Sequence, residues 1–391
     1  MNSAFCRSVI GAIKSCLPDT GEEIALHAPC FVGNEWNYVT ECLNTGWVSS
    51  VGTFVNRFEE MLAGYTGVKG AVSTVNGTAA LHICLKIAEI APGDEVLVPA
   101  LTFVATANAV SYCGATPHLA DCEEKTLGLD PYRLGEYLAE ITEMRNDTCF
   151  NRLTGNPIRA VVPVHTFGHP VDLDPLVELC ARFKLTLIED AAESLGSFYK
   201  GRHTGHWGKL AALSFNGNKT ITTGGGGAIL TNDESLAKLA KHLTTTARVG
   251  HNFSFFHDQI GYNYRMPNLN AALGCAQLEQ LPGFIEKKRA LAEGYRRAFQ
   301  DLPGVRFFVE PAFARSNYWL NVLLLDEANA LSKEELLDAT NKIGIHTRPA
   351  WTLIHRLPMY QDCPRMDLKT AENLEARLIN IPSSPFFYRP Q

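Results

Sequence analysis

The alternation of short apolar runs with helical patterns between residues 71 and 231 constrains the fold of this chain most. Candidate strands lie at residues 71–74, 95–98, 116–120, 159–164, 186–189, 210–215 and 228–231. Residues 79–90, 106–112 and 173–183 between them repeat their apolar positions with a helical period. Strands that are apolar throughout are typical of parallel sheets covered on both faces. The pattern predicts an α/β domain in which a mostly parallel sheet lies between two helical layers.

The pattern changes after about residue 250, where we expect a smaller α+β domain. Predicted helices at 268–281, 283–302, 332–342 and 370–379 flank strands at 305–309, 318–325 and one that starts at 346–348. Ser332 followed by Glu335 predicts a capping box. Further helices are expected at 6–16, 34–45 and 54–66. With 391 residues, the chain can form an N-terminal helical extension (1–25), a large domain (26–265) and a small C-terminal domain (266–391).

Charge and cysteine content argue against several classes of function. The net charge of −6 and the lack of a basic cluster argue against a nucleic-acid partner. The 11 cysteines form no CxxC pair and no metal-ligand spacing, so we expect free thiols and no metal site. No run approaches the ~20 apolar residues of a membrane span. We therefore expect a cytoplasmic protein that binds neither nucleic acid nor membrane.

Polar motifs follow several predicted strands, at the edge where open α/β sheets bind ligands. Residues 76–80 (Asn-Gly-Thr-Ala-Ala) precede a helix, whose free N–H groups can bind an anion. Phe103 follows the strand at 95–98 and could stack on a flat ring. Asp190 closes an apolar strand and could keep a pyridinium nitrogen protonated. A capped turn, a core aromatic and a helix cap are the ordinary alternatives.

The most informative residue is Lys219, within the glycine-rich run 214–228. Such a backbone can approach a phosphate-bearing cofactor closely, and the amine can form a Schiff base with a carbonyl and act as a general base. The alternatives are a surface lysine after a turn, or a dinucleotide-binding loop. The latter should lie in the first βα turn, whereas this run lies late and leads into a strand. Together the motifs predict an enzyme that uses pyridoxal phosphate.

The motifs resemble the signature blocks of the DegT-type sugar aminotransferases, which are fold-type I pyridoxal-phosphate enzymes. The blocks are residues 76–80, 163–168, 188–193 and 214–227, and the resemblance extends from about His27 to Ser383. It implies pyridoxal 5′-phosphate as cofactor and a homodimer with active sites at the subunit interface. Some relatives carry histidine at the lysine position and dehydrate sugars. The presence of Lys219 therefore implies transamination.

The resemblance also implies roles for individual residues. Lys219 would carry the cofactor, and Asp190 would pair with its pyridine nitrogen as the second catalytic residue. Further cofactor contacts are implied for Thr78, Ala79, Phe103, Glu193, Ser214 and Asn263, with Asn263 reaching the cofactor of the partner subunit. Glu193 stands where many relatives have glutamine or histidine. A carboxylate there would contact the ring hydroxyl only through a shared proton or a water.

A finer resemblance concerns the substrate and is carried by residues 45–52 and 100–110 and by the extra N-terminal helix. It points to enzymes that aminate C4 of UDP-4-keto-6-deoxy-N-acetylglucosamine with L-glutamate, giving UDP-N-acetylbacillosamine for surface glycans or legionaminic acid. Substrate contacts are then expected from Trp47, Ser49, Arg348 and His355, for which helix-end packing or a solvated loop is the alternative.

Two other functions stay open. One is a GDP-4-keto-6-deoxymannose 4-aminotransferase of the same family. The other is a non-catalytic regulator that binds pyridoxal phosphate, which should carry a DNA-binding module and basic patches. The sequence shows no such module beyond the short N-terminal helix.

Overall fold

The computed structural model describes residues 3–19, 21–250 and 255–387. Its main sheet has the order β1 (Gly70–Thr74), β11 (Gly227–Thr231), β10 (Leu210–Ser214), β7 (Thr186–Asp190), β6 (Pro157–Val161), β2 (Glu95–Pro99), β3 (Thr116–Ala120). Strands β10, β7, β6, β2 and β3 run parallel to one another, and β11 is antiparallel to both its neighbours. The expected mostly parallel sheet is confirmed.

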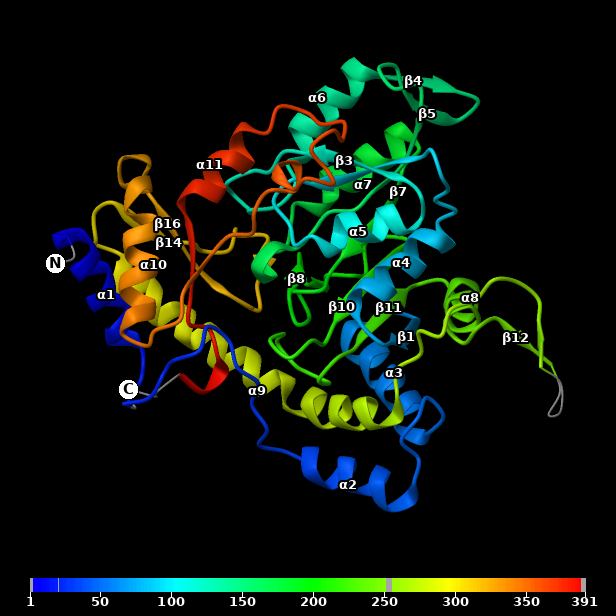
Figure 1. Cartoon of the computed structure of the whole chain (residues 1–391), viewed down its shortest axis with the longest axis horizontal. Coiled ribbons are helices and arrows are strands. Elements are labelled where there is room, and N and C mark those ends of the chain that lie inside the picture. The colour runs from blue at the N-terminus through cyan, green and yellow to red at the C-terminus, as the bar shows by residue number, and fades with distance from the viewer. Residues whose placement is uncertain (1–2, 20, 251–254, 388–391) are drawn as a thin grey trace.

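Both faces of this sheet are buried under helices (Figure 1). On β10, Ala212 belongs to one core cluster, while Ala211 and Leu213 belong to the other. Successive side chains of a strand point to opposite faces, so the two cores lie on opposite faces at β10. At β2 the first core contains both Leu97 and Val98 and so reaches both faces of the sheet. The first core contains residues of α4 (Gly77–Ile87), α5 (Ala105–Tyr112), α6 (Pro131–Ile141) and α7 (Leu173–Phe183), and the second those of α3 (Thr53–Thr66). The expected three-layer α/β/α class is confirmed.

Helix α9 (Asn268–Phe299) joins the two ends of the molecule. It lies beside α2 (Glu35–Thr45) and α3 at one end and beside α1 (Ala4–Cys16) at the other (Figure 1). We expected a break near Pro282, but the helix continues through it. A proline removes one hydrogen bond. Here the buried side chains of Leu281 before it and Phe284 after it pack into the same core, which holds the helix together, and Leu291 packs into another core farther along.

The C-terminal part forms the smaller α+β unit. Its antiparallel sheet has the order β14 (Val305–Phe307), β16 (Asn321–Leu325), β18 (Leu378–Ile381), β17 (Arg348–Pro349), beside α10 (Lys333–Lys342) and α11 (Lys369–Arg377). The residue limits of the three expected domains stay predictions. Leu353, Ile354 and Leu374 pack into the first core of the large sheet, so this region is not an isolated globule.

Two local expectations in this region were wrong. Residues 378 and 379 were expected to end a helix but begin β18, because pairing with β16 buries them. The capping box is absent at α10, where the Ser332 side chain makes no capping bond. Glu335 instead accepts a 2.6 Å hydrogen bond from the backbone N–H of Ser3, which ties the start of the described chain to α10.

Several elements had no expectation: α8 (Glu234–Thr244), β4 (Thr142–Arg145), β5 (Thr148–Asn151), β8 (Phe198–Tyr199), β9 (Arg202–His203), β12 (Arg248–Val249), β13 (Phe256–His257) and β15 (Ala314–Arg315). Short 3-10 turns lie at Thr166–Gly168, Glu327–Ser332, Ile354–Arg356 and Pro385–Phe387. Among the described residues, no helix is long and apolar enough to span a bilayer. The same residues contain no cluster of three or more histidine, cysteine, aspartate or glutamate side chains that could hold a metal ion.

Candidate active site

A cavity of about 310 Å³ lies at the carboxyl edge of the parallel strands. Six of the residues singled out from the sequence line it: Thr78, Phe103, Asp190, Glu193, Ser214 and Lys219. They come from the segments that follow β1, β2, β7 and β10, or from the last residues of these strands. The carboxyl ends of the strands thus bring together residues that are far apart in the chain, as expected for an open α/β sheet.

Asp190 is the last residue of β7 and is buried. Its Oδ2 accepts a 2.8 Å hydrogen bond from the hydroxyl of Thr106, and its Oδ1 accepts one of 3.2 Å from the N–H of Ala192. Burial raises the pKa of Asp190, and these hydrogen bonds and the nearby Lys219 oppose that shift. A cationic ring nitrogen in the cavity would supply the countercharge that a buried carboxylate requires.

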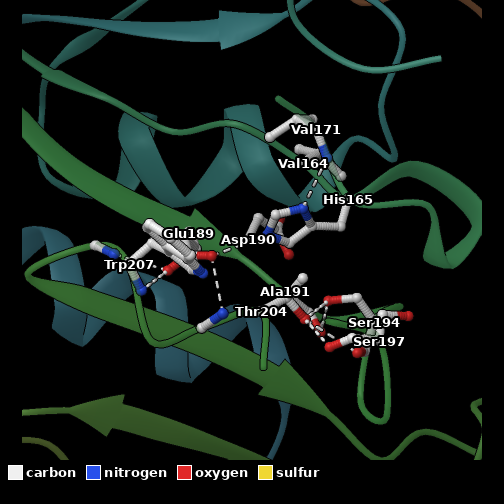
Figure 2. Close-up of polar contacts among 12 residues, drawn as sticks. Val164, His165, Val171, Glu189, Asp190, Ala191, Ser194, Ser197, Thr204 and Trp207 are labelled. Atoms are coloured by element: carbon white, nitrogen blue, oxygen red, sulfur yellow. Dashed lines mark hydrogen bonds and ion pairs between the residues drawn. The ribbon is translucent and has the colours of Figure 1, made fainter. Parts of the chain in front are cut away.

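The neighbouring acid, Glu189, has a different environment (Figure 2). Its carboxylate accepts backbone N–H groups at 2.7 to 2.8 Å from Gly205, Trp207 and Gly208, and it lies 3.0 Å from Nε2 of His165. Burial alone would raise the pKa of Glu189, but the hydrogen bonds from His165 and the backbone outweigh it and lower that pKa. Glu189 is therefore fully satisfied within the protein framework.

His165 links this framework to Asp190. The N–H of Val171 donates to Nδ1 of His165 at 3.3 Å, so Nε2 carries the ring proton and donates it to Glu189 (Figure 2). The backbone N–H of His165 also donates to the carbonyl of Asp190 at 3.2 Å. Of the two adjacent acids, one anchors the end of the strand and the other lines the cavity.

Lys219 lies between an acid and an indole ring. Its Nζ is 3.3 Å from Oε1 of Glu193 and 3.9 Å from the ring centroid of Trp319. The second oxygen of Glu193 accepts the N–H of Phe167 at 2.8 Å. Burial raises the pKa of Glu193, while the charge of Lys219 opposes that shift. The amine and the carboxyl group are thus held together inside the cavity.

The start of α4 fits one end of a phosphate-bearing cofactor. Asn76 caps the helix by accepting the N–H of Ala79 at 2.7 Å. A Cβ on Gly77 would lie 2.8 Å from that of Ser214, so glycine lets the helix begin close to β10. The first N–H groups of a helix have no intrahelical partner and favour an anion, and Thr78 and Ser214, which carry hydroxyls, line the same cavity. The donor set therefore matches a phosphate, and Lys219 and Asp190 line the same cavity. Ala79 does not line it.

The remaining sequence candidates lie outside this cavity. Trp47 and Ser49 are exposed, and their carbonyls accept hydrogen bonds from Asn268. Arg348 is exposed and donates to Asn341 and to the carbonyl of Thr347. His355 pairs with Glu372 at 3.2 Å, and Asn263 is exposed opposite Thr245. The roles expected for these five candidates stay predictions.

Several residues that line the cavity had no role predicted from the sequence, among them Thr106, Trp319 and Trp351. Thr106 lies three residues after Phe103 in the segment that follows β2, so its place after a strand end was a signal for it. Trp319 and Trp351 also line the cavity, but they come from the C-terminal region. No local pattern links them to Lys219, because the fold alone brings these segments together.

The chain is similar to known proteins over most of its length. The model of the DegT/DnrJ/EryC1/StrS aminotransferase family matches residues 29–389. The chain is 38% identical to the GDP-perosamine synthases of Caulobacter vibrioides and Escherichia coli O157:H7, over 92% and 93% of this chain and 93% of each relative. Among solved structures, it resembles Helicobacter pylori PseC, an aminotransferase of pseudoaminic acid biosynthesis, with a TM-score of 0.83 and 27% identity over 92% of this chain and 94% of that one.

These relatives correct one expectation. The finer resemblance predicted a UDP-4-keto-6-deoxy-N-acetylglucosamine aminotransferase that makes UDP-N-acetylbacillosamine. That prediction is wrong, because relatives that match nearly the whole chain are GDP-perosamine synthases. They support the alternative function, a GDP-sugar 4-aminotransferase.

Proposed function

Because the chain belongs to the DegT/DnrJ/EryC1/StrS aminotransferase family and is a sugar aminotransferase that uses pyridoxal phosphate, we propose that it aminates C4 of GDP-4-keto-6-deoxymannose. L-Glutamate is the proposed amino donor. The proposal rests on one observation: Lys219 lies in the same cavity as Asp190 and the first residues of α4, whose N–H groups can bind a phosphate. The GDP-perosamine synthases, which are similar over nearly the whole chain, support the choice of nucleotide and sugar.

When bound, pyridoxal phosphate supplies an aldehyde that exchanges amines and a ring that withdraws electrons from the reacting bond. The first turn of α4, with Thr78 and Ser214, would hold the phosphate. Asp190, fixed by Thr106, would keep the ring nitrogen protonated. Phe103, Trp319 and Trp351 line the cavity, and their apolar rings would limit the water around a bound substrate.

Lys219 has two tasks in this scheme. Its amine would hold the cofactor, and the incoming amino group would displace it. The freed amine would then accept a proton from the substrate carbon and give it up again. Glu193, 3.3 Å from Nζ, would stabilise the ammonium form of Lys219 while it holds that proton.

We also propose that the protein works as a homodimer. Large apolar side chains are exposed on α2 and the segments that flank it: Phe31, Val32, Trp36, Leu43, Trp47, Val48 and Val51. Trp36 is 79% exposed, which is unusual for a tryptophan on a monomer surface. A second subunit over this face would bury these residues and would explain why Trp47 and Ser49 lie outside the single-chain cavity.

The test supplies the purified protein with pyridoxal phosphate, L-glutamate and either GDP-4-keto-6-deoxymannose or a UDP-4-keto-6-deoxysugar. The expected product is an aminated GDP-sugar, identified by its mass and by proton coupling constants around C4. A kcat/KM for the UDP-sugar equal to or above that for the GDP-sugar would reject the proposed substrate. Sedimentation or light scattering of the same sample tests the dimer.

A further inference from the structure

A buried segment of the smaller unit encloses the amine of Lys219. Residues 316–320 connect β15 to β16 and are buried throughout. Within them, Trp319 is 3% exposed and presents its ring to Nζ of Lys219 at 3.9 Å. Glu193 lies 3.3 Å from the same amine. The amine therefore has a π face and a carboxylate as its two described neighbours in the cavity.

Trp319 is fixed at three points. Its Nε1–H donates a 2.7 Å hydrogen bond to the carbonyl of Asn218, the residue directly before Lys219. Its backbone N–H donates to Oδ1 of Asn317 at 2.7 Å, and its carbonyl accepts from Nζ of the buried Lys288 at 3.2 Å. The ring cannot turn away from the amine without losing the indole hydrogen bond.

Asn317 extends this attachment to the other side of Lys219. Its Nδ2 lies 2.8 Å from the carbonyl of Glu193 and 3.2 Å from the hydroxyl of Thr220, the residue directly after Lys219. Gly168 makes room for this side chain, because a Cβ at that position would lie 1.9 Å from Oδ1 of Asn317. The segment thus contacts the residues immediately before and after the lysine and the backbone of its acidic partner.

We propose that Trp319 is a positioning residue for Lys219: it holds the amine beside Glu193 and favours the ammonium form over its ring. A desolvated cation over an indole face is stabilised substantially. When the amine accepts the proton of the substrate carbon, the C–H electron pair stays with the substrate and the new ammonium lies between the ring and the carboxylate. This role rests on the proposed function, but the geometry that defines it can be tested without any substrate.

The experiment compares Trp319→Leu, Trp319→Phe and the control Phe308→Leu, which alters a buried aromatic that does not line the cavity. In the cofactor-free proteins, Lys219 is acylated with an amine-selective reagent at one fixed pH, and the modified peptide is measured by mass spectrometry. We expect the initial labelling rate of Lys219 in Trp319→Leu to rise about tenfold, because the amine loses the ring that covers and holds it. Trp319→Phe retains a π face and should keep the wild-type labelling rate, as should Phe308→Leu.

The half-reaction with L-glutamate gives a second readout. Because Trp319→Phe loses only the indole hydrogen bond to Asn218, its kcat should fall by about tenfold with little change in the KM for glutamate. An unchanged or lowered labelling rate for Trp319→Leu, or a wild-type kcat for Trp319→Phe, overturns the proposal. If Trp319→Leu does not fold, Trp319→Phe decides alone. A wild-type protein that fails to aminate any ketosugar rejects the proposed function and leaves the labelling result intact.

Discussion

The hydroxyl of Thr106 donates a 2.8 Å hydrogen bond to Oδ2 of Asp190 and so joins the start of α5 to the end of β7. This bond and the one from the N–H of Ala192 orient a carboxylate that burial would otherwise favour in its neutral form. A neutral Asp190 could not hold a ring nitrogen in its protonated state. The threonine therefore acts on the cofactor through the acid.

Replacing Thr106 with valine keeps the shape of the side chain and removes the donor. Losing a hydrogen bond to a buried charged group costs about 1.5–3 kcal/mol, so we expect the affinity for pyridoxal phosphate to fall by about tenfold or more. A titration followed by cofactor absorbance measures it. Thr66→Val, which removes a buried hydroxyl within α3, is the control and should leave the affinity unchanged. Equal affinities in the two variants would contradict the role of Thr106.

Replacing Lys219 with alanine should abolish the visible absorbance band of the bound cofactor and the turnover of glutamate, because no amine is left to attach the aldehyde. Absorbance spectra and a single-turnover assay test this. Lys200→Ala removes an exposed lysine that pairs with Asp174 and should behave as wild type. A Lys219→Ala protein with a full cofactor band and normal activity would show that the assignment is wrong.

Replacing Glu193 with glutamine should change how stability depends on pH. Burial raises the pKa of Glu193 in the folded state. Between its unfolded value of about 4.3 and this raised value, the folded protein binds more protons, so the wild type loses stability as pH rises. Glutamine does not titrate. In urea unfolding of the cofactor-free proteins, the stability of wild type relative to Glu193→Gln should therefore be lower at pH 8 than at pH 5. A gap that does not vary with pH would contradict this.

Lys288 gives the opposite slope. Burial lowers the pKa of Lys288 well below its ordinary value. Between that lowered value and about 10.4, the unfolded chain binds more protons, so stability rises with pH. The stability of wild type relative to Lys288→Met should therefore increase from pH 7 to pH 9.5 in urea unfolding. Lys287→Met, at the adjacent exposed position, should show no such change. A flat difference for Lys288→Met would mean that the amine is charged in the folded protein.

The sequence predicted the large sheet well because its parallel strands are apolar throughout and are separated by helical patterns. It was misleading where tertiary packing outweighs a local signal. Pro282 predicts a helix end, yet α9 continues through it because Leu281 and Phe284, on either side of the proline, are both buried in one core. Residues 378 and 379 fit a helical pattern, but pairing with β16 makes them a strand.

In the site, too, residues marked by a local sequence signal were predicted, and residues placed by tertiary packing were not. Asp190 and Lys219 could be found because Asp190 ends a strand, Lys219 follows one, and each carries chemistry unusual in a core. Trp319 could not, since its contact with Lys219 depends on how the smaller unit folds back onto the large sheet. The residues expected to bind the sugar lie outside the cavity of a single chain, and no pattern within one sequence shows what a second chain would add.

The continuity of α9 has a consequence for how the molecule melts. A helix of 32 residues is about 48 Å long, and its two halves contribute buried side chains to different cores. Neither core can lose its packing without exposing the buried side chains on one half of α9. Calorimetry should therefore record one cooperative heat-absorption peak for the whole chain, with equal calorimetric and van't Hoff enthalpies for the cofactor-free protein.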